Sequence, residues 1–337
     1  MRRLVLAATL LAGVVAGAFW YLEPDDGGGL VLYSAEDYGA AAARAFTERT
    51  GVPVSTVSLS TGALLARVAA EGRRPRWDVA WFDGAESAAG LAAAGLTGRL
   101  HAVIDWNRLG RRLVPADGDW LPTGTTLAGV FVVPAVSPYP APRTWGALAS
   151  WQGRIGMSNP AISGPAFPIL AALLEAGGGW PAGKPFVRGL VGAGMRIYAK
   201  NANTLAALRA GEIDLALVQS SAGFAFARVH SGFRVVVPDP AVALPSVLVI
   251  PARLAPGKRA QVLRFARFVM SPLGQHLRMR MNEPDALYWP LTRNVARPRD
   301  VQGLPPPPAD LKFFDASVWG RRQGDMDRWF SKLWEVR

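Results

Sequence analysis

Short apolar runs alternate with longer alanine-rich runs between residues 30 and 84. The run LVLYSAED predicts a strand that ends near Ser34, and the alanine and arginine pattern after it predicts a helix that Gly51 closes. A β-branched run from Val52 to Leu59 predicts a second strand, and WDVAWFDG predicts a third strand that ends at Asp83. Strands that alternate with helices form parallel sheets, whose ligands bind beyond the carboxyl ends of the strands. The pattern therefore predicts a ligand-binding sheet edge.

The later part of the chain repeats this alternation and is interrupted by prolines. TLAGVFVVP, from Thr126 to Pro134, predicts a strand, and the proline-rich run from Pro134 to Pro142 predicts a first crossing into a second lobe. FRVVVPDPAVALPSVLVIP predicts the return, and a helix from Ala260 to about Met281 then completes the first lobe. A hinged clamp requires two crossings, and 337 residues exceed the usual size of one compact domain. We expect an α/β protein with lobe 1 at residues 29–130 and 246–337 and lobe 2 at residues 131–245.

Several motifs, in this order, carry a family resemblance: AFTERTGVPV, the loop STG before a helix, WDVAWFDG, WGALASWQGRIGMSNPAISGPAF, NTLAALRAGEIDLALVQSS and RFARFVMSPLGQHL. Together they resemble type II periplasmic solute-binding proteins of ABC importers, closest to the branch that binds ferric iron and 2-aminoethylphosphonate. The resemblance implies a two-lobed clamp in which each lobe is a mostly parallel sheet flanked by helices. It also implies a monomer that delivers a small-molecule solute to an inner-membrane ABC permease.

The N-terminus has the features of a secretory signal. Arg2 and Arg3 precede an apolar run, and residues 16–18 (AGA) offer a small-residue cleavage site, so residues 1–28 are predicted to be a signal peptide and tether. The apolar run continues to Leu22, long enough for a membrane anchor. We therefore expect a periplasmic protein, either released or anchored to the inner membrane through residues 4–22. An anchored form would suit a ligand sensor that signals to a partner.

Charge and cysteine content narrow the function classes. The formal net charge is +12, but the arginines are scattered and no recognition module accompanies them, so no nucleic-acid binding is expected. The chain has no cysteine, which removes disulfides, thiolate chemistry and attachment of lipid at an N-terminal cysteine. No cofactor is expected.

Two loops that open helices are candidates for holding an anion. Ser60, Thr61 and Gly62 supply hydroxyl and backbone N–H donors before one helix, and Ser163 and Gly164 supply them before another in the second lobe. A serine before a helix is often only a cap. Because the two loops are expected on facing lobes, we interpret them as the two sides of an oxyanion site.

Acidic residues at strand ends could hold a cation. Asp83 ends the third strand, and the resemblance aligns it with a metal-coordinating carboxylate of ferric-binding relatives. Glu36, after Ser34 at the end of the first strand, lies near another ligand position of those relatives, so both join the predicted ligand-binding set. Asn203, at a second-lobe helix start, could add donors, although a capping role is equally plausible.

Ser220 and Ser221 mark a departure from the ferric-binding relatives. Those relatives carry two adjacent tyrosines there, and serine hydroxyls are far poorer ligands for Fe(III). The predicted ligand is therefore a zwitterion such as 2-aminoethylphosphonate, with its ammonium near Asp83. Ferric iron held by other ligands is the alternative. An enzyme is not expected, because no nucleophile, base and orienting group can be assembled around the three histidines.

Overall fold

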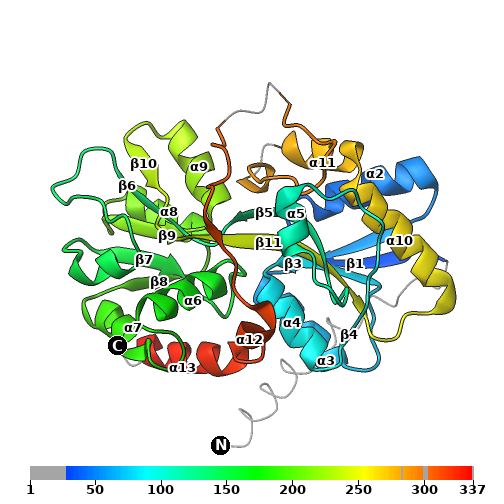
Figure 1. Cartoon of the computed structure of the whole chain (residues 1–337), viewed down its shortest axis with the longest axis horizontal. Coiled ribbons are helices and arrows are strands. Elements are labelled where there is room, and N and C mark those ends of the chain that lie inside the picture. Colours follow the sequence, from blue (N-terminus) through cyan, green and yellow to red (C-terminus); the bar gives the residue numbers. More distant parts are fainter. Residues whose placement is uncertain (1–27, 282–283, 299–302, 336–337) are drawn as a thin grey trace, which may run out of the picture.

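The computed structural model describes residues 28–281, 284–298 and 303–335, which form two lobes, each built on its own sheet (Figure 1). None of the helices in these ranges combines the length and the apolar character needed to cross a membrane. The signal or anchor predicted for the N-terminus lies outside the described residues. The predicted α/β architecture with two lobes is confirmed.

The first sheet has the strand order β12-β11-β3-β1-β2, with β4 and β5 also pairing with β11. Strands β2, β1 and β3 are parallel, whereas β11 runs antiparallel to β3 and to β5. The bounds are β1 Leu30–Ser34, β2 Val54–Ser58, β3 Val79–Asp83, β4 Thr97–Gly98, β5 Leu121–Leu127, β11 Ala241–Pro251 and β12 Leu311–Lys312.

The second sheet has the strand order β10-β6-β9-β7-β8. Strands β8, β7 and β9 are parallel, and β6 is antiparallel to both β9 and β10. The bounds are β6 Val130–Pro134, β7 Ile155–Ser158, β8 Arg196–Tyr198, β9 Leu215–Val218 and β10 Phe233–Val236. Each sheet therefore has a group of parallel strands, extended on one side by antiparallel ones.

The helices lie around these sheets. Their bounds are α2 Gly39–Thr50, α3 Thr61–Glu71, α4 Ala85–Ala93, α5 Arg108–Leu113, α6 Ala166–Ala176, α7 Lys184–Gly192, α8 Asn201–Arg209, α9 Ser220–Val229, α10 Pro256–Met270, α11 Pro272–Met279, α12 Ala316–Gly320 and α13 Gln323–Glu335, with short 3₁₀ helices η1 Gly146–Ser150 and η2 Pro284–Ala286. Local chemistry explains several ends. Gly51 closes α2 in the left-handed conformation, with φ of 73°, and the Ser60 side chain caps α3.

The long helix predicted from Ala260 to about Met281 is two helices. Ser271 interrupts it with an extended backbone, and Pro272 supplies the first residue of α11. The Ser271 hydroxyl accepts a hydrogen bond from the Gly274 amide at 3.2 Å, so this serine caps the second helix. The Ser-Pro pair was the sequence signal for this break.

The crossing between the lobes lies earlier than the proline-rich run. The strand predicted over Thr126–Pro134 is instead two strands, because β5 ends at Leu127 in the first sheet and β6 begins at Val130 in the second. The run Pro134–Pro142 therefore begins at the last residue of β6, within the second lobe, and is not the crossing. The return lies between β10 and β11, and β11 accommodates Pro245 beside a bulge at Ser246 and Val247. The exact lobe boundaries stay a prediction.

The C-terminal helices contact both lobes, although residues 246–337 were assigned to lobe 1. Helix α12 packs against α4 in the first lobe, and α13 packs against α7 in the second (Figure 1). Phe330 of α13 is buried in the core of the second lobe. The C-terminal segment thus connects the two lobes through contacts of α12 with α4 and of α13 with α7.

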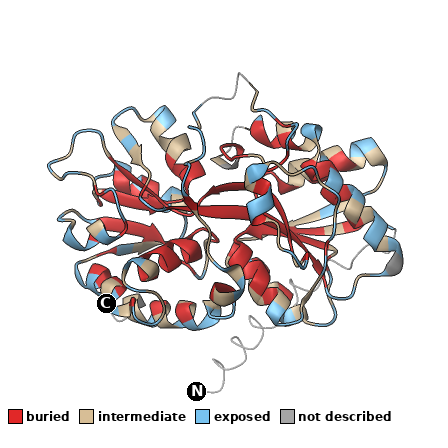
Figure 2. Cartoon of the chain, viewed as in Figure 1, coloured by how far each residue is buried: buried red, intermediate tan, exposed pale blue. Residues whose placement is uncertain are grey.

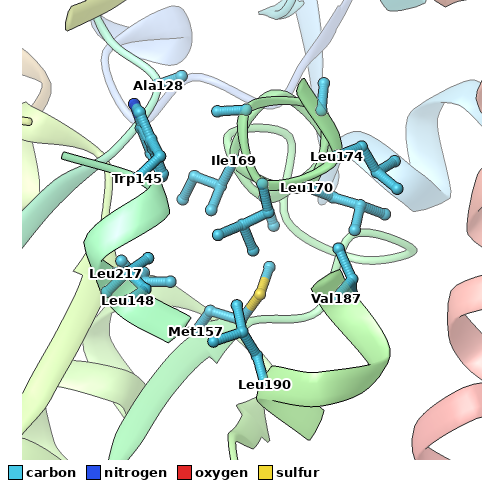
Figure 3. Close-up of a cluster of buried hydrophobic side chains, with 14 of the residues drawn as sticks. Ala128, Trp145, Leu148, Met157, Ile169, Leu170, Leu174, Val187, Leu190 and Leu217 are labelled. Atoms are coloured by element: carbon cyan, nitrogen blue, oxygen red, sulfur yellow. The ribbon is translucent and has the colours of Figure 1, made fainter. Parts of the chain in front are cut away.

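Each lobe has its own apolar core, and the buried residues follow the central strands (Figure 2). In the second lobe, Ile169 and Leu170 of α6 pack toward Met157 and Leu190 (Figure 3). The cores leave the strand ends between the lobes free to carry polar side chains.

Candidate functional site

A cavity of about 660 Å³ lies between the lobes and is lined from both sides. The first lobe contributes the strand-end and loop residues Asp37, Ser60, Thr61 and Asp83. The second lobe contributes the loop at 162–165, residues of helix α8, and residues along the length of α9 with His230 after it. The position agrees with the rule that α/β sheets bind ligands beyond the carboxyl ends of their strands.

Asp83 lies at the floor of the cavity, where β3 ends. It is buried, and its carboxylate accepts hydrogen bonds from the Ser246 hydroxyl at 2.7 Å and from the Gln219 side-chain amide at 2.9 Å. Burial raises the pKa of Asp83 above its ordinary value, while the Ser246 hydrogen bond and the nearby Arg278 guanidinium partly oppose the shift. A cation next to Asp83 would therefore favour the ionised carboxylate, which burial alone disfavours.

Glu36 lies beside Asp83, beneath the cavity, and is not one of its lining residues. It is buried, and a hydrogen bond between the two side chains is one of the effects that lower the pKa of Asp83. Buried Arg278 lies behind them, donating to the Ser246 hydroxyl at 3.3 Å with its guanidinium stacked over Tyr288 at 3.7 Å from the ring centroid. Two carboxyl groups and one guanidinium thus form a connected polar layer beneath the cavity.

Gln219 joins this layer from the other lobe. Its amide nitrogen donates to Asp83 Oδ2 and, at 3.0 Å, to the Thr126 hydroxyl of β5. Gln219 follows β9 of the second sheet, whereas Asp83 and Thr126 belong to the first. These bonds connect the lobes, and no motif in the sequence distinguishes this glutamine from other glutamines.

The two helix-opening loops that were predicted to face each other are in direct contact. The Gly62 amide donates to the Ile162 carbonyl at 3.2 Å, which closes one end of the cavity. A Cβ at Gly62 would lie 2.0 Å from the Ala161 carbonyl oxygen, and one at Gly164 would lie 2.5 Å from the Thr61 hydroxyl. The approach therefore requires glycine on both sides. Ser60 accepts from the Ala63 amide at 3.2 Å and acts as a cap, while Ser163 lines the cavity.

The two adjacent serines at the start of α9 have different surroundings. Ser220 is fully buried, and its hydroxyl accepts from the Leu127 amide at 2.9 Å, so it holds the second lobe to β5. Ser221 is also fully buried and lines the cavity, and its hydroxyl has no hydrogen-bond partner among the described residues. The first turn of α9 directs its positive dipole end at the same space. Ser221 is therefore suited to bind an anionic group.

A basic wall of the cavity was not predicted from the sequence. Lys200, Arg209, Arg228 and His230 line it from α8, α9 and their flanking residues. The His230 ring stacks on Phe226 with centroids 4.2 Å apart. A single basic residue near a helix end cannot be recognised from sequence as lining a cavity, because most such residues are solvated surface groups. The fold brings these four together.

The remaining predicted residues do not line the cavity. Ser34 is buried and hydrogen-bonds the Glu36 backbone amide at 3.1 Å, so it shapes the strand-end turn. Asn203 is exposed on α8, whereas the neighbouring Asn201 lines the cavity and accepts from the Ser158 hydroxyl at 2.8 Å. Within the described residues, no group of three or more His, Cys, Asp or Glu side chains could hold a metal ion.

Comparison with known proteins identifies relatives. Residues 41–308 match the family model of bacterial extracellular solute-binding proteins. The major ferric iron-binding protein of Neisseria meningitidis serogroup A is 30% identical over 234 residues, which cover 68% of this chain and 66% of that protein. The match thus spans just under two thirds of the relative's length.

Solved structures share the fold at lower sequence identity. The periplasmic binding protein P5PA has a TM-score of 0.75 at 19% identity, covering 91% of this chain and 99% of its own. AfuA from Actinobacillus pleuropneumoniae, with exogenous fructose-6-phosphate bound, has a TM-score of 0.69 at 16% identity, covering 91% and 99%.

Proposed function

The chain belongs to the bacterial extracellular solute-binding proteins, and on that premise we propose that it captures a small anionic or zwitterionic solute between its lobes. The ligand class we favour is a phosphonate-like zwitterion such as 2-aminoethylphosphonate. The observation that carries this proposal is the opposite polarity of the two cavity walls. Asp37 and Asp83 line the first-lobe side, whereas Ser163, Ser221 and four basic residues line the second-lobe side.

The chemistry of each wall matches one end of such a ligand. An ammonium group beside Asp83 would favour the ionised carboxylate and offset the burial that raises the pKa of Asp83. A phosphonate near Ser221 would receive hydroxyl and helix N-terminal N–H donors, which prefer anions. The cavity of about 660 Å³ also has room for a ligand with a larger body than 2-aminoethylphosphonate.

Capture would proceed by closure of the two lobes. A ligand that contacts both walls stabilises the closed arrangement by contacts that an open one lacks. The protein would then deliver the solute, as a monomer in the periplasm, to an inner-membrane ABC permease. A tethered form that reports closure to a partner remains the alternative if residues 4–22 are retained as an anchor. Enzymatic activity is no part of the proposal.

Ferric iron is the second candidate, because the Neisseria relative is named for binding it. The chain has serines at 220 and 221, and Ser220 is already engaged with β5. Asp83 accepts hydrogen bonds from two partners, which leaves it a poorer metal ligand than a free carboxylate. A visible charge-transfer band on addition of stoichiometric Fe(III) would favour iron over the zwitterion.

A thermal-shift screen tests the proposal. Ligand that binds only the folded protein raises its apparent stability, by about 2.7 kcal/mol at a concentration 100 times Kd. Phosphonates, phosphate esters, polyamines, thiamine and Fe(III) would be compared at equal concentration. We expect the largest rise in Tm with an aminoalkylphosphonate. A rise with Fe(III) or a polyamine alone would reject the proposed ligand class.

A further inference from the structure

A second basic surface lies on the first lobe, formed by α2, α10 and α11, which run together in Figure 1. A groove there is lined by Phe46, Arg49 and Thr50 of α2, by Arg264, Arg267 and Phe268 of α10, and by Ser271, Pro272 and Leu273 at the start of α11. Its lining residues are different from those of the cavity between the lobes. The groove is therefore a separate surface feature from the cavity between the lobes.

The arginines that line this groove form no ion pair with any of the described residues. Arg49, Arg264 and Arg267 are all exposed and line the same groove. On α2 and α10 the exposed arginines are Arg44, Arg49, Arg259, Arg264 and Arg267, and the exposed acid on these two helices is Glu48. The excess of positive charge remains when the acidic residues at 23, 25 and 26 of the preceding chain are counted.

Exposed apolar side chains lie next to the arginines of the groove. Leu273 and Leu277 are 42% and 38% exposed, and they stand four residues apart on one face of α11. Exposed leucines beside arginines are typical of surfaces that lie in a membrane interface, where the apolar side chains enter the acyl boundary and the cations meet headgroups. A free phosphate would use the arginines but not the leucines.

The chain enters the first lobe beside this face. The Gln261 side chain of α10 donates to the Gly28 carbonyl at 2.8 Å, and Lys258 donates to the Gly29 carbonyl. Arg267 is six residues further along α10, about 9 Å along the helix axis. The apolar run that ends at Leu22 precedes Gly28 by six residues, which span at most about 20 Å. An anchor at residues 4–22 would hold this face near the bilayer.

We propose that the α2–α10–α11 face docks on a membrane surface of anionic phospholipids, with Arg49, Arg264 and Arg267 on the phosphate headgroups and Leu273 and Leu277 in the interface. Each basic residue close to an anionic membrane strengthens binding by about fivefold, and the attraction falls off within a Debye length. Docking would orient the protein against the inner membrane whether the N-terminal segment is retained or removed.

The test uses the full chain, whose lack of cysteine allows a single labelled site. An environment-sensitive dye is placed on Leu273→Cys, and on Val136→Cys in the second lobe as the reference, since Val136 is 93% exposed and lies in the loop after β6. Each protein is mixed with phosphatidylcholine vesicles, or with phosphatidylcholine and phosphatidylglycerol vesicles, that carry a lipid-bound quencher. We expect quenching at 273 to exceed that at 136 several-fold, only with the anionic vesicles and only at low salt.

Charge variants separate docking from insertion of the N-terminal segment, which is present in every sample. Arg49→Gln, Arg264→Gln and Arg267→Gln combined should abolish the quenching at 273. The charge-matched control, Arg143→Gln, Arg188→Gln and Arg234→Gln combined, removes three exposed second-lobe arginines and should preserve it. Circular dichroism confirms that both variants fold. Equal quenching at 273 and 136, or equal quenching with neutral and anionic vesicles, would overturn the proposal. An acidic protein would then be the alternative partner for this face.

Discussion

The two walls of the cavity between the lobes each present one buried polar side chain, Asp83 and Ser221, and these two differ in their hydrogen bonds. On the first-lobe wall, Asp83 is buried and bonded to Ser246 and Gln219. On the second-lobe wall, Ser221 is buried without a hydrogen-bond partner among the described residues, and Lys200 and Arg209 are exposed. A carboxylate that is already hydrogen-bonded is preorganised, whereas a hydroxyl without a partner gains a hydrogen bond only when ligand arrives. This difference fits the proposal that Asp83 positions a cation and that Ser221 binds an anion.

Removing the charge of Asp83 should have the largest effect. Asp83→Asn leaves a desolvated ammonium without its charge partner, a loss of roughly 2 to 5 kcal/mol in the binding of 2-aminoethylphosphonate. Ethylphosphonate, which lacks the amine, should bind as well or better. Isothermal titration calorimetry measures both. Asp37→Asn is the control, and it should cost less because Asp37 is exposed and screened by water. Equal affinities in wild type and Asp83→Asn for the aminated compound would remove Asp83 from the site.

Removing a hydroxyl from the second wall should weaken both ligands equally. Ser221→Ala, or Ser163→Ala, deletes a hydrogen bond to a charged group, which contributes about 1.5 to 3 kcal/mol. Ser220→Ala is the matched control, because Ser220 bonds the Leu127 amide and should lower Tm without changing affinity. An affinity loss confined to the Ser220 variant would show that the anion does not contact the cavity-lining serines.

Blocking the contact between the walls tests whether capture requires closure. Gly62→Ala places a Cβ 2.0 Å from the Ala161 carbonyl oxygen, so closure must be incomplete or strained. Strain of this kind typically costs about 1 to 3 kcal/mol, and affinity for either ligand should fall accordingly. Gly189→Ala, in open space on α7, serves as the control. Small-angle scattering should show wild type contracting on ligand addition and Gly62→Ala contracting less. Unchanged affinity in Gly62→Ala would show that ligand binding does not require closure of the lobes.

The two walls should also differ in their response to pH. Because burial raises the pKa of Asp83, this group is protonated in the free folded protein over a wider pH range than an ordinary aspartate. Affinity for the aminated ligand should therefore rise with pH as Asp83 ionises, by at most tenfold per pH unit. The raised pKa of Asp83 also lowers the stability of the folded protein. Its contribution to the free energy of unfolding is most favourable below the ordinary aspartate pKa, and it declines as pH rises from that value to the pKa of Asp83 in the folded protein. Binding of ethylphosphonate should show no such rise, and a rise shared by both ligands would assign the effect to another group.

The hydrogen bonds that Gln219 makes between the lobes should have the smallest effect. Gln219→Leu removes the donors to Asp83 and Thr126, each worth about 0.5 to 1.5 kcal/mol in stability. We expect a lower Tm and a small change in affinity, measured by calorimetry. Gln152→Leu, an exposed glutamine of the second lobe, is the control. A large loss of affinity would instead mean that Gln219 contacts ligand directly.

Local sequence signals predicted much of the fold but less of the site. Gly51, Ser60 and the strand ending at Asp83 carry short-range signals, and the structure contains the helix end, the cap and the strand they predict. The crossing was misplaced because one apolar run, Thr126–Pro134, supplies strands to both sheets, and apolar periodicity does not report which sheet a strand joins. Gln219 and the basic wall depend on contacts between distant segments. No local pattern distinguishes such residues from surface residues.

Walls of opposite polarity require a ligand that places a positive charge on the first-lobe wall and a negative charge on the second-lobe wall. Calorimetric titration of the wild-type protein with 2-aminoethylphosphonate and with ethylphosphonate tests this requirement most directly, since the compounds differ only in the amine. We predict that the aminated compound binds more tightly by roughly 2 kcal/mol or more, the lower limit for a desolvated charge pair. Equal binding of the two compounds, or tighter binding of ethylphosphonate, would show that the first-lobe wall does not bind the amine.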